Sequence, residues 1–192
     1  MLLERDRPAR TISISQEAFI DSTLTRFNLT DAATVATPLT PGTPLSAGDC
    51  PTSKDEIEEM EDRPYRELIG ALAWLIPGTR LGIAFATSSL ARFGHNPGRV
   101  HWDVAKRVVR YLKGTKQRRL TLGGKPPQIA VFTDADWGSH RDDRRSIGAY
   151  PIKIGDEVVS LRSKKQPYVA PSSTEAEYMA LCQASKEADT QQ

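Results

Sequence analysis

The stretch VFTDADWGSH, residues 131–140, decides the fold class because it ends an apolar strand pattern with two carboxylates. Residues 129–132 read as a β-strand that continues into Asp134 and Asp136. Aspartate is a poor strand residue and is costly to bury as an ion. On a strand, residues two positions apart project from the same face, so these carboxylates repel each other unless a cation lies between them. The pattern raises the question of a metal site at the end of a sheet.

The sequence that follows predicts an antiparallel sheet covered by a helix. Gly155-Asp156 separates two strand patterns and is a hairpin signal. Ser172 and Glu175 fit a capping box at the start of the helix, and Glu177 lies in its first turns. The two strands and the helix are expected over residues 146–154, 157–163 and 171–188.

The first half of the chain is predicted to be mainly helical. A strand end and a short helix are expected within residues 11–29, and three amphipathic helices within residues 62–78, 81–93 and 100–115. Such helices bury their apolar faces only against one another or against a neighbouring domain. We expect Trp74, Trp102 and Trp137 to anchor cores.

The composition excludes a membrane-spanning protein and predicts an intracellular one. Of the 192 residues, 39% are hydrophobic and 26% are charged, which is ordinary for a soluble globular protein. No apolar run approaches the roughly 18 residues of a membrane span, and the N-terminal MLLERDRPAR is too charged for a secretory signal. We expect a cytoplasmic particle or the nucleus as the location, no secretion, and neither disulfide nor zinc at Cys50 and Cys182.

The net charge of +2 hides a segregation of charge. Residues 55–62 hold six acids and no base, which indicates a solvated linker or the start of a helix. Residues 99–119 hold eight bases against one acid, and their helical part is either an anion-facing surface or a solvated face. The candidate residues of this basic surface are Lys106, Arg107, Arg110, Lys113, Lys116, Arg118 and Arg119.

The acids at the sheet end suit a hard divalent cation. Magnesium prefers oxygen ligands and keeps several waters, so Asp134, Asp136 and Glu177 from separate elements make a reasonable site. Such a site suits phosphodiester hydrolysis by two metals. The alternative is a strand-end cap or a solvated acid pair, with Glu177 favoured by the helix dipole alone. Residue spacing leaves both interpretations open.

Four long stretches resemble the end of the Pol polyprotein of copia-type LTR retrotransposons, where reverse transcriptase passes into its ribonuclease H domain. They are YRELIGALAWLIPGTR, HWDVAKRVVRYLKGT, DADWGSHRDDRRSIGAY and SKKQPYVAPSSTEAEYMAL, and the resemblance runs from Thr11 to Ala188. It implies an α+β fold, in which a small helical, thumb-like or connection-like segment precedes a truncated ribonuclease H-like sheet with one packed helix.

The resemblance also implies an organisation into four parts. Residues 1–37 would be the end of the reverse transcriptase palm and the start of the thumb-like segment, and residues 38–61 a flexible Pro/Thr-rich and acidic linker. Residues 62–122 would form the helical thumb-like or connection-like segment, and residues 128–192 a partial ribonuclease H-like domain.

For the site, the resemblance assigns catalytic, metal-binding roles to Asp134 and Glu177 and an auxiliary role to Asp136, with Mg²⁺ as the cofactor. The parent activity is RNA-directed DNA synthesis with hydrolysis of RNA in RNA/DNA hybrids. The basic surface is similar to the segment that tracks the hybrid, so its seven residues become candidates for binding nucleic acid. The expected partners are an RNA/DNA hybrid or other nucleic acid and the remainder of the Pol polyprotein.

Departures from the family pattern limit the expected activity. The polymerase aspartates are expected before residue 1, and the later ribonuclease H acids are absent from the 192 residues. Pro151 falls in a strand that should be central, and Leu161 replaces a tryptophan that is usual in the family. We expect weak or absent Mg²⁺ binding and little or no hydrolysis by this chain alone, so its status as an enzyme stays open. The alternatives are a non-catalytic RNA/DNA-binding remnant and a transposon relic without function.

Overall fold

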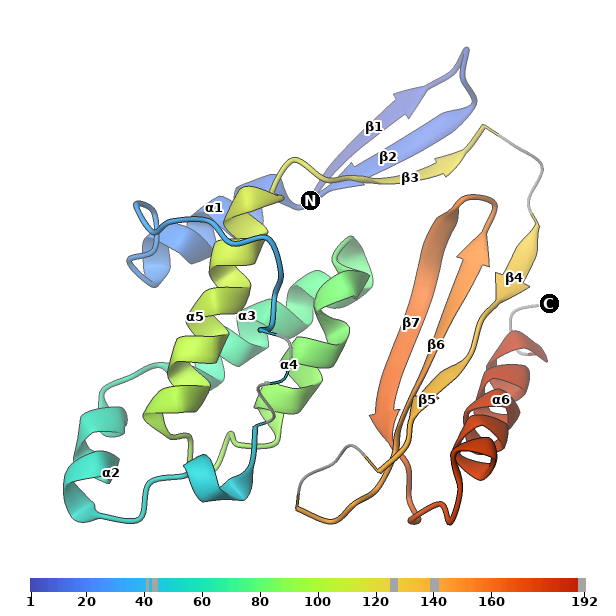
Figure 1. Cartoon of the computed structure of the whole chain (residues 1–192). Coiled ribbons are helices and arrows are strands. Elements are labelled where there is room, and N and C mark those ends of the chain that lie inside the picture. Colours follow the sequence, from blue (N-terminus) through green and yellow to red (C-terminus); the bar gives the residue numbers. More distant parts are fainter. Residues whose placement is uncertain (41, 43–44, 125–127, 139–141, 190–192) are drawn as a thin grey trace. The chain divides into compact units, whose positions relative to one another are not determined.

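The computed structural model describes residues 1–40, 42, 45–124, 128–138 and 142–189, and its chain forms two compact units (Figure 1). One unit contains residues 1–3 and 14–119 and is helical. The other contains residues 4–13 and the chain from residue 120 onward, and it holds most of the strands and one helix. The predicted α+β class is confirmed.

Five α-helices make up the described part of the first unit: α1 (Glu17–Arg26), α2 (Lys54–Glu61), α3 (Tyr65–Gly78), α4 (Ala84–Ala91) and α5 (Arg99–Gly114). Short 3-10 turns cover Ala47–Asp49 and Leu81–Ile83. Helix α2 falls within the segment 38–61, where the sequence predicts a flexible linker. It begins at a capping box in which Ser53 Oγ accepts the Glu56 N–H and the Glu56 carboxylate accepts the Ser53 N–H.

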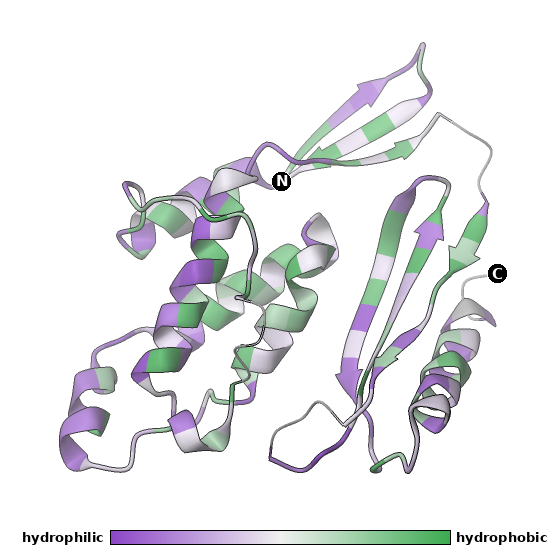
Figure 2. Ribbon diagram, viewed as in Figure 1, coloured by the Kyte–Doolittle hydropathy of each residue, from purple (hydrophilic) through white to green (hydrophobic). Residues whose placement is uncertain are grey.

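The core of this unit lies between α1, α3, α4 and α5. Figure 2 shows apolar residues along α3 and α4, and alternating apolar and polar residues on α5. Helices α3 and α5 thus bury their apolar faces in this core, as expected. Helix α4 lies in the core too but is not amphipathic as predicted, because its buried residues, Thr87 and Ser89 among them, fall on all its sides. Fully buried side chains include Ile20, Leu68, Leu72, Leu75, Leu90, Val108 and Leu112.

Two tryptophans lie outside the cores that they were expected to anchor. Trp74 is 63% exposed, because the buried stripe of α3 follows Leu68, Leu72 and Leu75 and Trp74 falls beside it. Trp137 is 52% exposed in the other unit. The prediction is wrong for both residues.

The start of α5 depends on a buried histidine and a close backbone approach. The His101 ring is fully buried, stacks on Phe93 at 3.9 Å between ring centroids, and accepts the Gly98 N–H at Nδ1 (2.9 Å). A Cβ at Gly98 would lie 2.0 Å from the Asp49 carbonyl oxygen, so only glycine fits. Burial lowers the pKa of His101, with the nearby Arg92 acting in the same direction and Asp49 opposing it.

We predict that this unit loses stability on acidification because protonated Nδ1 cannot accept the Gly98 N–H. A histidine with a lowered folded-state pKa stabilises the fold above its ordinary value of about 6.5, and this contribution is lost as the pH falls through the lower folded-state value. The free energy of unfolding, measured with urea at pH values between 7 and 5, tests this prediction. A His101→Gln variant should be less stable at pH 7 but show a shallower pH dependence. The exposed His95→Gln variant should follow the wild type, and equal slopes for all three proteins would refute the prediction.

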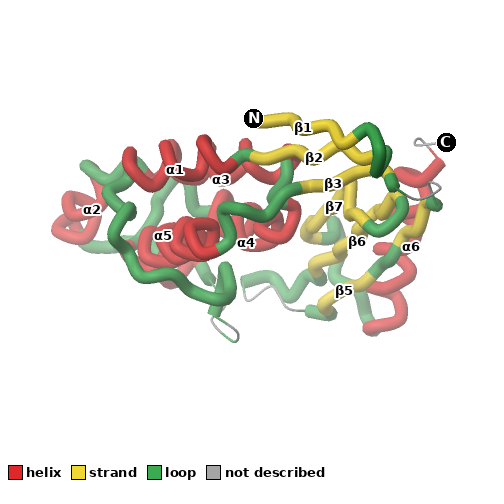
Figure 3. The backbone as a smooth tube through the Cα atoms, turned by 90° about the horizontal axis from the view of Figure 1, so that it is seen from above, coloured by secondary structure: helices red, strands yellow, loops and turns green. Residues whose placement is uncertain are grey.

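The strands form two sheets. Strands β1 (Leu2–Asp6), β2 (Thr11–Ser15) and β3 (Leu120–Gly123) form a sheet in that order (Figure 3). Strand β1 was not predicted, because its side chains are all exposed and give no buried alternation. A hydrogen bond of 2.9 Å between the hydroxyls of Ser13 and Thr121 joins β2 to β3.

The second sheet is antiparallel, with β6 (Ile147–Ile154) at its centre and α6 (Ser173–Asp189) packed on it. Strands β4 (Ile129–Val131) and β5 (Asp134–Asp136) pair with one side of β6 in a single register, and β7 (Glu157–Lys165) pairs with the other. Pro151 lies within β6, opposite Leu161, and a bulge follows one residue later. The predicted hairpin turn is confirmed by Gly155, whose φ is +64°.

Small residues let α6 approach the sheet closely. Ala176, Ala180 and Ala184 form its buried face, and a Cβ at Gly148 would lie 3.4 Å from the Ala180 Cβ. The helix starts at Ser172 Oγ, which accepts the Glu175 N–H and thus provides half of the predicted capping box.

Candidate functional site

The predicted metal ligands Asp134 and Asp136 both lie on β5, which pairs only with β6 in the described part of the chain. Both residues are exposed, and the Asp134 Oδ1 accepts the adjacent Ala135 N–H (2.9 Å). Asp134 lies opposite Ala149 and Asp136 opposite Ile147 in the ladder, so both project from one face, as their spacing predicts.

Helix α6 covers the other face of this strand. Gly148, which contacts Ala180 of α6, is the ladder partner of Ala135. Strand alternation therefore directs Asp134 and Asp136 away from the helix. Glu177 is exposed on α6, next to the buried Ala176.

The first turns of α6 nevertheless lie at the carboxyl end of β5. The Trp137 indole Nε1 donates to the Ala170 carbonyl oxygen (2.9 Å), just before the helix. The Gln166 amide Nε2 donates to the Ala176 carbonyl oxygen (2.7 Å), and the Gln166 backbone N–H donates to Ser146, before β6. The carboxylates of β5 and Glu177 thus belong to one end of the sheet.

These acids do not make a complete metal site. Among the residues that the structure describes, no group of three or more His, Cys, Asp or Glu side chains could hold a metal ion. A magnesium site formed by protein oxygens alone needs more ligands than Asp134 and Glu177 supply. The residues present therefore do not fit a closed Mg²⁺ centre, and the joint role of Asp134 and Glu177 stays a prediction.

The cations of the basic surface in the first unit fall into two groups: some pair with carboxylates, and others bond to neutral oxygens. Lys106 Nζ lies 2.8 Å from the Asp103 carboxylate. Lys116 Nζ lies 2.9 Å from the Asp21 carboxylate and 3.8 Å from that of Glu17, and the hydrogen bond to Asp21 raises the pKa of Lys116. Nearby carboxylates therefore offset the charges of these two lysines.

Three other cations bond to neutral oxygens of the loop that follows α1. Arg107 Nη2 donates to the Thr37 hydroxyl (3.1 Å), Arg110 Nε to the Ala33 carbonyl (2.6 Å) and Lys113 Nζ to the Ala32 carbonyl (2.9 Å). We call Arg107, Arg110 and Lys113 the α5 clamp. A neutral acceptor orients a cation without cancelling its charge, so the clamp keeps its positive potential. Arg118 and Arg119, beyond α5, are exposed.

Arg80 supports the end of α5 and was not among the predicted site residues. It is buried, and its Nη2 donates to the Thr115 carbonyl (2.6 Å) just beyond the last turn. A cation favours the negative end of the helix dipole, although burial lowers the pKa of this guanidinium. Arg80 thereby helps to fix the end of the helix that carries Lys113.

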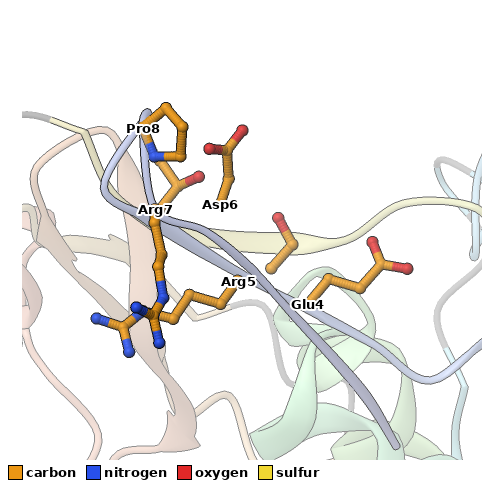
Figure 4. A pocket seen from close by; sticks show the side chains of 7 residues that line it. Glu4, Arg5, Asp6, Arg7 and Pro8 are labelled. Atoms are coloured by element: carbon orange, nitrogen blue, oxygen red, sulfur yellow. The ribbon is translucent and has the colours of Figure 1, made fainter.

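The β1–β2 hairpin carries a second basic feature that the sequence analysis missed. Arg5 and Arg7 line a shallow hollow together with Glu4, Asp6, Pro8, Thr11 and Ser13, and Figure 4 shows the two guanidinium groups next to each other, with the carboxylates of Glu4 and Asp6 pointing elsewhere. Neither group has a carboxylate partner among the residues described. Two adjacent guanidinium groups favour an anion between them. The spacing Arg-x-Arg could have predicted this pair, because residues two positions apart on a strand place their side chains on one face.

We predict that the α5 clamp holds residues 32–37 on the helix. A double variant, Arg110→Gln with Lys113→Gln, removes two charge-assisted hydrogen bonds to that loop. Amide hydrogen exchange in residues 32–37 should become about tenfold faster, which corresponds to roughly 1.4 kcal/mol. Lys106→Gln is the matched control because its partner lies on α5 itself. Unchanged exchange in the double variant would contradict the prediction.

In the part of the chain that the structure describes, no helix has the length and apolar character needed to cross a membrane.

The chain is similar to three proteins of different lengths. It is 39% identical to the retrovirus-related Pol polyprotein from transposon TNT 1-94 of Nicotiana tabacum, over 97% of this chain and 14% of that protein. It is 34% identical to the Pol polyprotein from transposon RE1 of Arabidopsis thaliana, over 96% of this chain and 12% of that protein. It is 42% identical to secreted RxLR effector protein 161 of Plasmopara viticola, over 67% of this chain and 92% of that protein.

No protein-family model matches the chain, and no solved structure gives a significant match. The chain spans about one seventh of the length of the tobacco Pol polyprotein that it matches.

Proposed function

We propose that the chain is a fragment of a retrovirus-related Pol polyprotein from a transposon, from the part in which reverse transcriptase meets ribonuclease H, because 96–97% of it is 33–39% identical to such polyproteins. RNA-directed DNA synthesis and hydrolysis of RNA in hybrids would be activities of the whole polyprotein. The fragment itself would bind the sugar-phosphate backbone of an RNA/DNA hybrid without cleaving it.

The observation that carries the proposal is the α5 clamp. Arg107, Arg110 and Lys113 face neutral oxygens, and Arg110 uses only Nε for its loop contact, which leaves its two terminal nitrogens available. Guanidinium and ammonium groups whose charge is not cancelled bind phosphates independently of nucleotide sequence. The affinity of such contacts falls steeply as the salt concentration rises. Arg118, which is exposed in the same unit, would add a further phosphate contact.

The structure supports a binding role more directly than a catalytic one. Bound Mg²⁺ would activate water and stabilise the leaving oxygen of the RNA backbone. Asp134 and Glu177 are at most part of its ligand set, because the described residues hold no cluster of three potential ligands. We therefore assign no hydrolytic step to this chain. The remainder of the Pol polyprotein is the proposed source of the other ligands and the proposed partner.

We predict salt-dependent binding of a labelled RNA/DNA hybrid, measured by fluorescence anisotropy. The slope of log K against log salt is negative, and it should become less steep by about one unit for Arg110→Gln and by about one more for Arg118→Gln, because each variant loses one phosphate contact. Lys106→Gln should change the slope least, since Asp103 already pairs with that lysine. Equal slopes in all variants, or no binding by the wild type, would refute the proposed function.

We also predict that the chain alone does not cleave the hybrid. With Mg²⁺ present, the amount of product from a labelled RNA strand should equal that of an Asp134→Asn variant and of a reaction without protein. Metal-dependent cleavage that Asp134→Asn abolishes would show instead that the partial ligand set suffices.

A transposon relic without function is the remaining alternative, and it predicts a different result. A relic has no need of a cooperative fold, whereas the packed core between α1, α3, α4 and α5 predicts one. Urea unfolding with a single sharp transition in the first unit would oppose the relic, and a gradual loss of signal would favour it.

A further inference from the structure

Trp137 is exposed in a way that fixes its ring. The indole N–H donates to the Ala170 carbonyl oxygen (2.9 Å), so the polar group is satisfied while 52% of the residue remains accessible. The next residue, Gly138, has a φ of +60° and donates its N–H to the buried Ser146 Oγ (3.1 Å). The ring and the backbone beside it are therefore held in place at the carboxyl end of β5.

Arg144 lies against this turn, and its side chain is exposed. Its Nη2 lies 3.6 Å from the position that a Cβ of Gly138 would occupy, which places the guanidinium beside the turn. Its backbone φ is +57°, a strained value for an arginine. The described residues offer Arg144 no carboxylate or hydrogen-bond acceptor, whereas the neighbouring Arg145 is 3.5 Å from the Asp143 carboxylate.

A second aromatic side chain belongs to the same end of the sheet. Tyr168 is 74% exposed and precedes Ala170, the acceptor of the Trp137 N–H, by two residues. The loop that carries Tyr168 is fixed because the Gln166 N–H donates to the Ser146 carbonyl (2.8 Å). Val169, which follows Tyr168, is also exposed (55%).

We propose that Trp137, Tyr168 and Arg144 form a subsite for one unpaired nucleotide of a nucleic acid. A base stacks on an aromatic face, and the phosphate beside it pairs with the guanidinium of Arg144. An exposed, fixed indole ring with a second exposed aromatic residue and a cation at the same end of the sheet is a combination that suits single-stranded nucleic acid. Stacking needs a base that is free of its partner strand, which distinguishes this subsite from the backbone contacts of the α5 clamp. The inference rests on the proposed function and adds the unpaired base to it.

The experiment uses the full chain with Trp74→Phe and Trp102→Phe, so that Trp137 is the one remaining tryptophan. Three RNA/DNA hybrids are compared: blunt, with a short single-stranded overhang, and with the same overhang lacking its bases. Trp137 fluorescence should be quenched by the overhang and not by the other two. The overhang should tighten binding about fivefold or more, in line with roughly 1 kcal/mol or more for each stacked base.

Two variants separate stacking from charge. Tyr168→Ala, at a highly exposed position, should remove most of the gain from the overhang without affecting the fold. For the overhang hybrid, Arg144→Gln should make the negative slope of log K against log salt less steep by about one unit. Arg145→Gln is the matched control, because Asp143 already pairs with that arginine.

Equal quenching by the base-free overhang, or equal affinities for the overhang and blunt hybrids in wild type and variants, would overturn the inference. Binding of the blunt hybrid would in that case leave the proposed function standing. If the protein binds no hybrid at all, the proposed function fails, and the absence of quenching by the overhang then removes the subsite as well.

Discussion

Three cationic side chains of α5 donate hydrogen bonds to neutral oxygens rather than to carboxylates, and the proposed function depends on this difference. Arg107, Arg110 and Lys113 donate to a hydroxyl and two carbonyls of the loop after α1, whereas Lys106 and Lys116 face carboxylates. A cation bonded to a carboxylate contributes little field at a distance, but one bonded to a carbonyl keeps its full charge. The same contacts therefore serve two purposes: they fix the loop, and they present oriented cations to an anion.

In the second unit the controlling constraint is the close approach of α6 to β6. The contact between Ala180 and Gly148 sets the side on which the helix lies, and the alternation of β5 then sends Asp134 and Asp136 to the opposite side. Glu177 lies in the first turns of α6, and therefore on the helix side, at the same end of the sheet. In the described part of the chain β5 has β6 as its one partner strand, so an ion shared between these acids would lie at the other edge of β5 and would need further ligands from elsewhere.

The sequence predicts those elements whose signal is local. The hairpin at Gly155 and helix α5 follow from turn chemistry and from the 3.6-residue period, and both are confirmed. The clamp was not predictable because its partners are 70 to 81 residues apart and include backbone carbonyls, which any sequence provides. Trp137 was misjudged because its hydrogen bond to Ala170, rather than burial, fixes the ring. For the carboxylates, spacing predicted the shared face of Asp134 and Asp136 but could not give the side taken by α6.

The alanines of α6 have one further consequence. Ala176, Ala180 and Ala184 present the same small side chain every four residues, so steric fit alone hardly distinguishes the observed position from one shifted by four residues, about 6 Å. The bond from the Gln166 amide to the Ala176 carbonyl breaks this degeneracy, because only one carbonyl of the helix can occupy that place. Gln166 thus helps to set which turn of α6 lies against the sheet, and with it the position of Glu177 along the sheet.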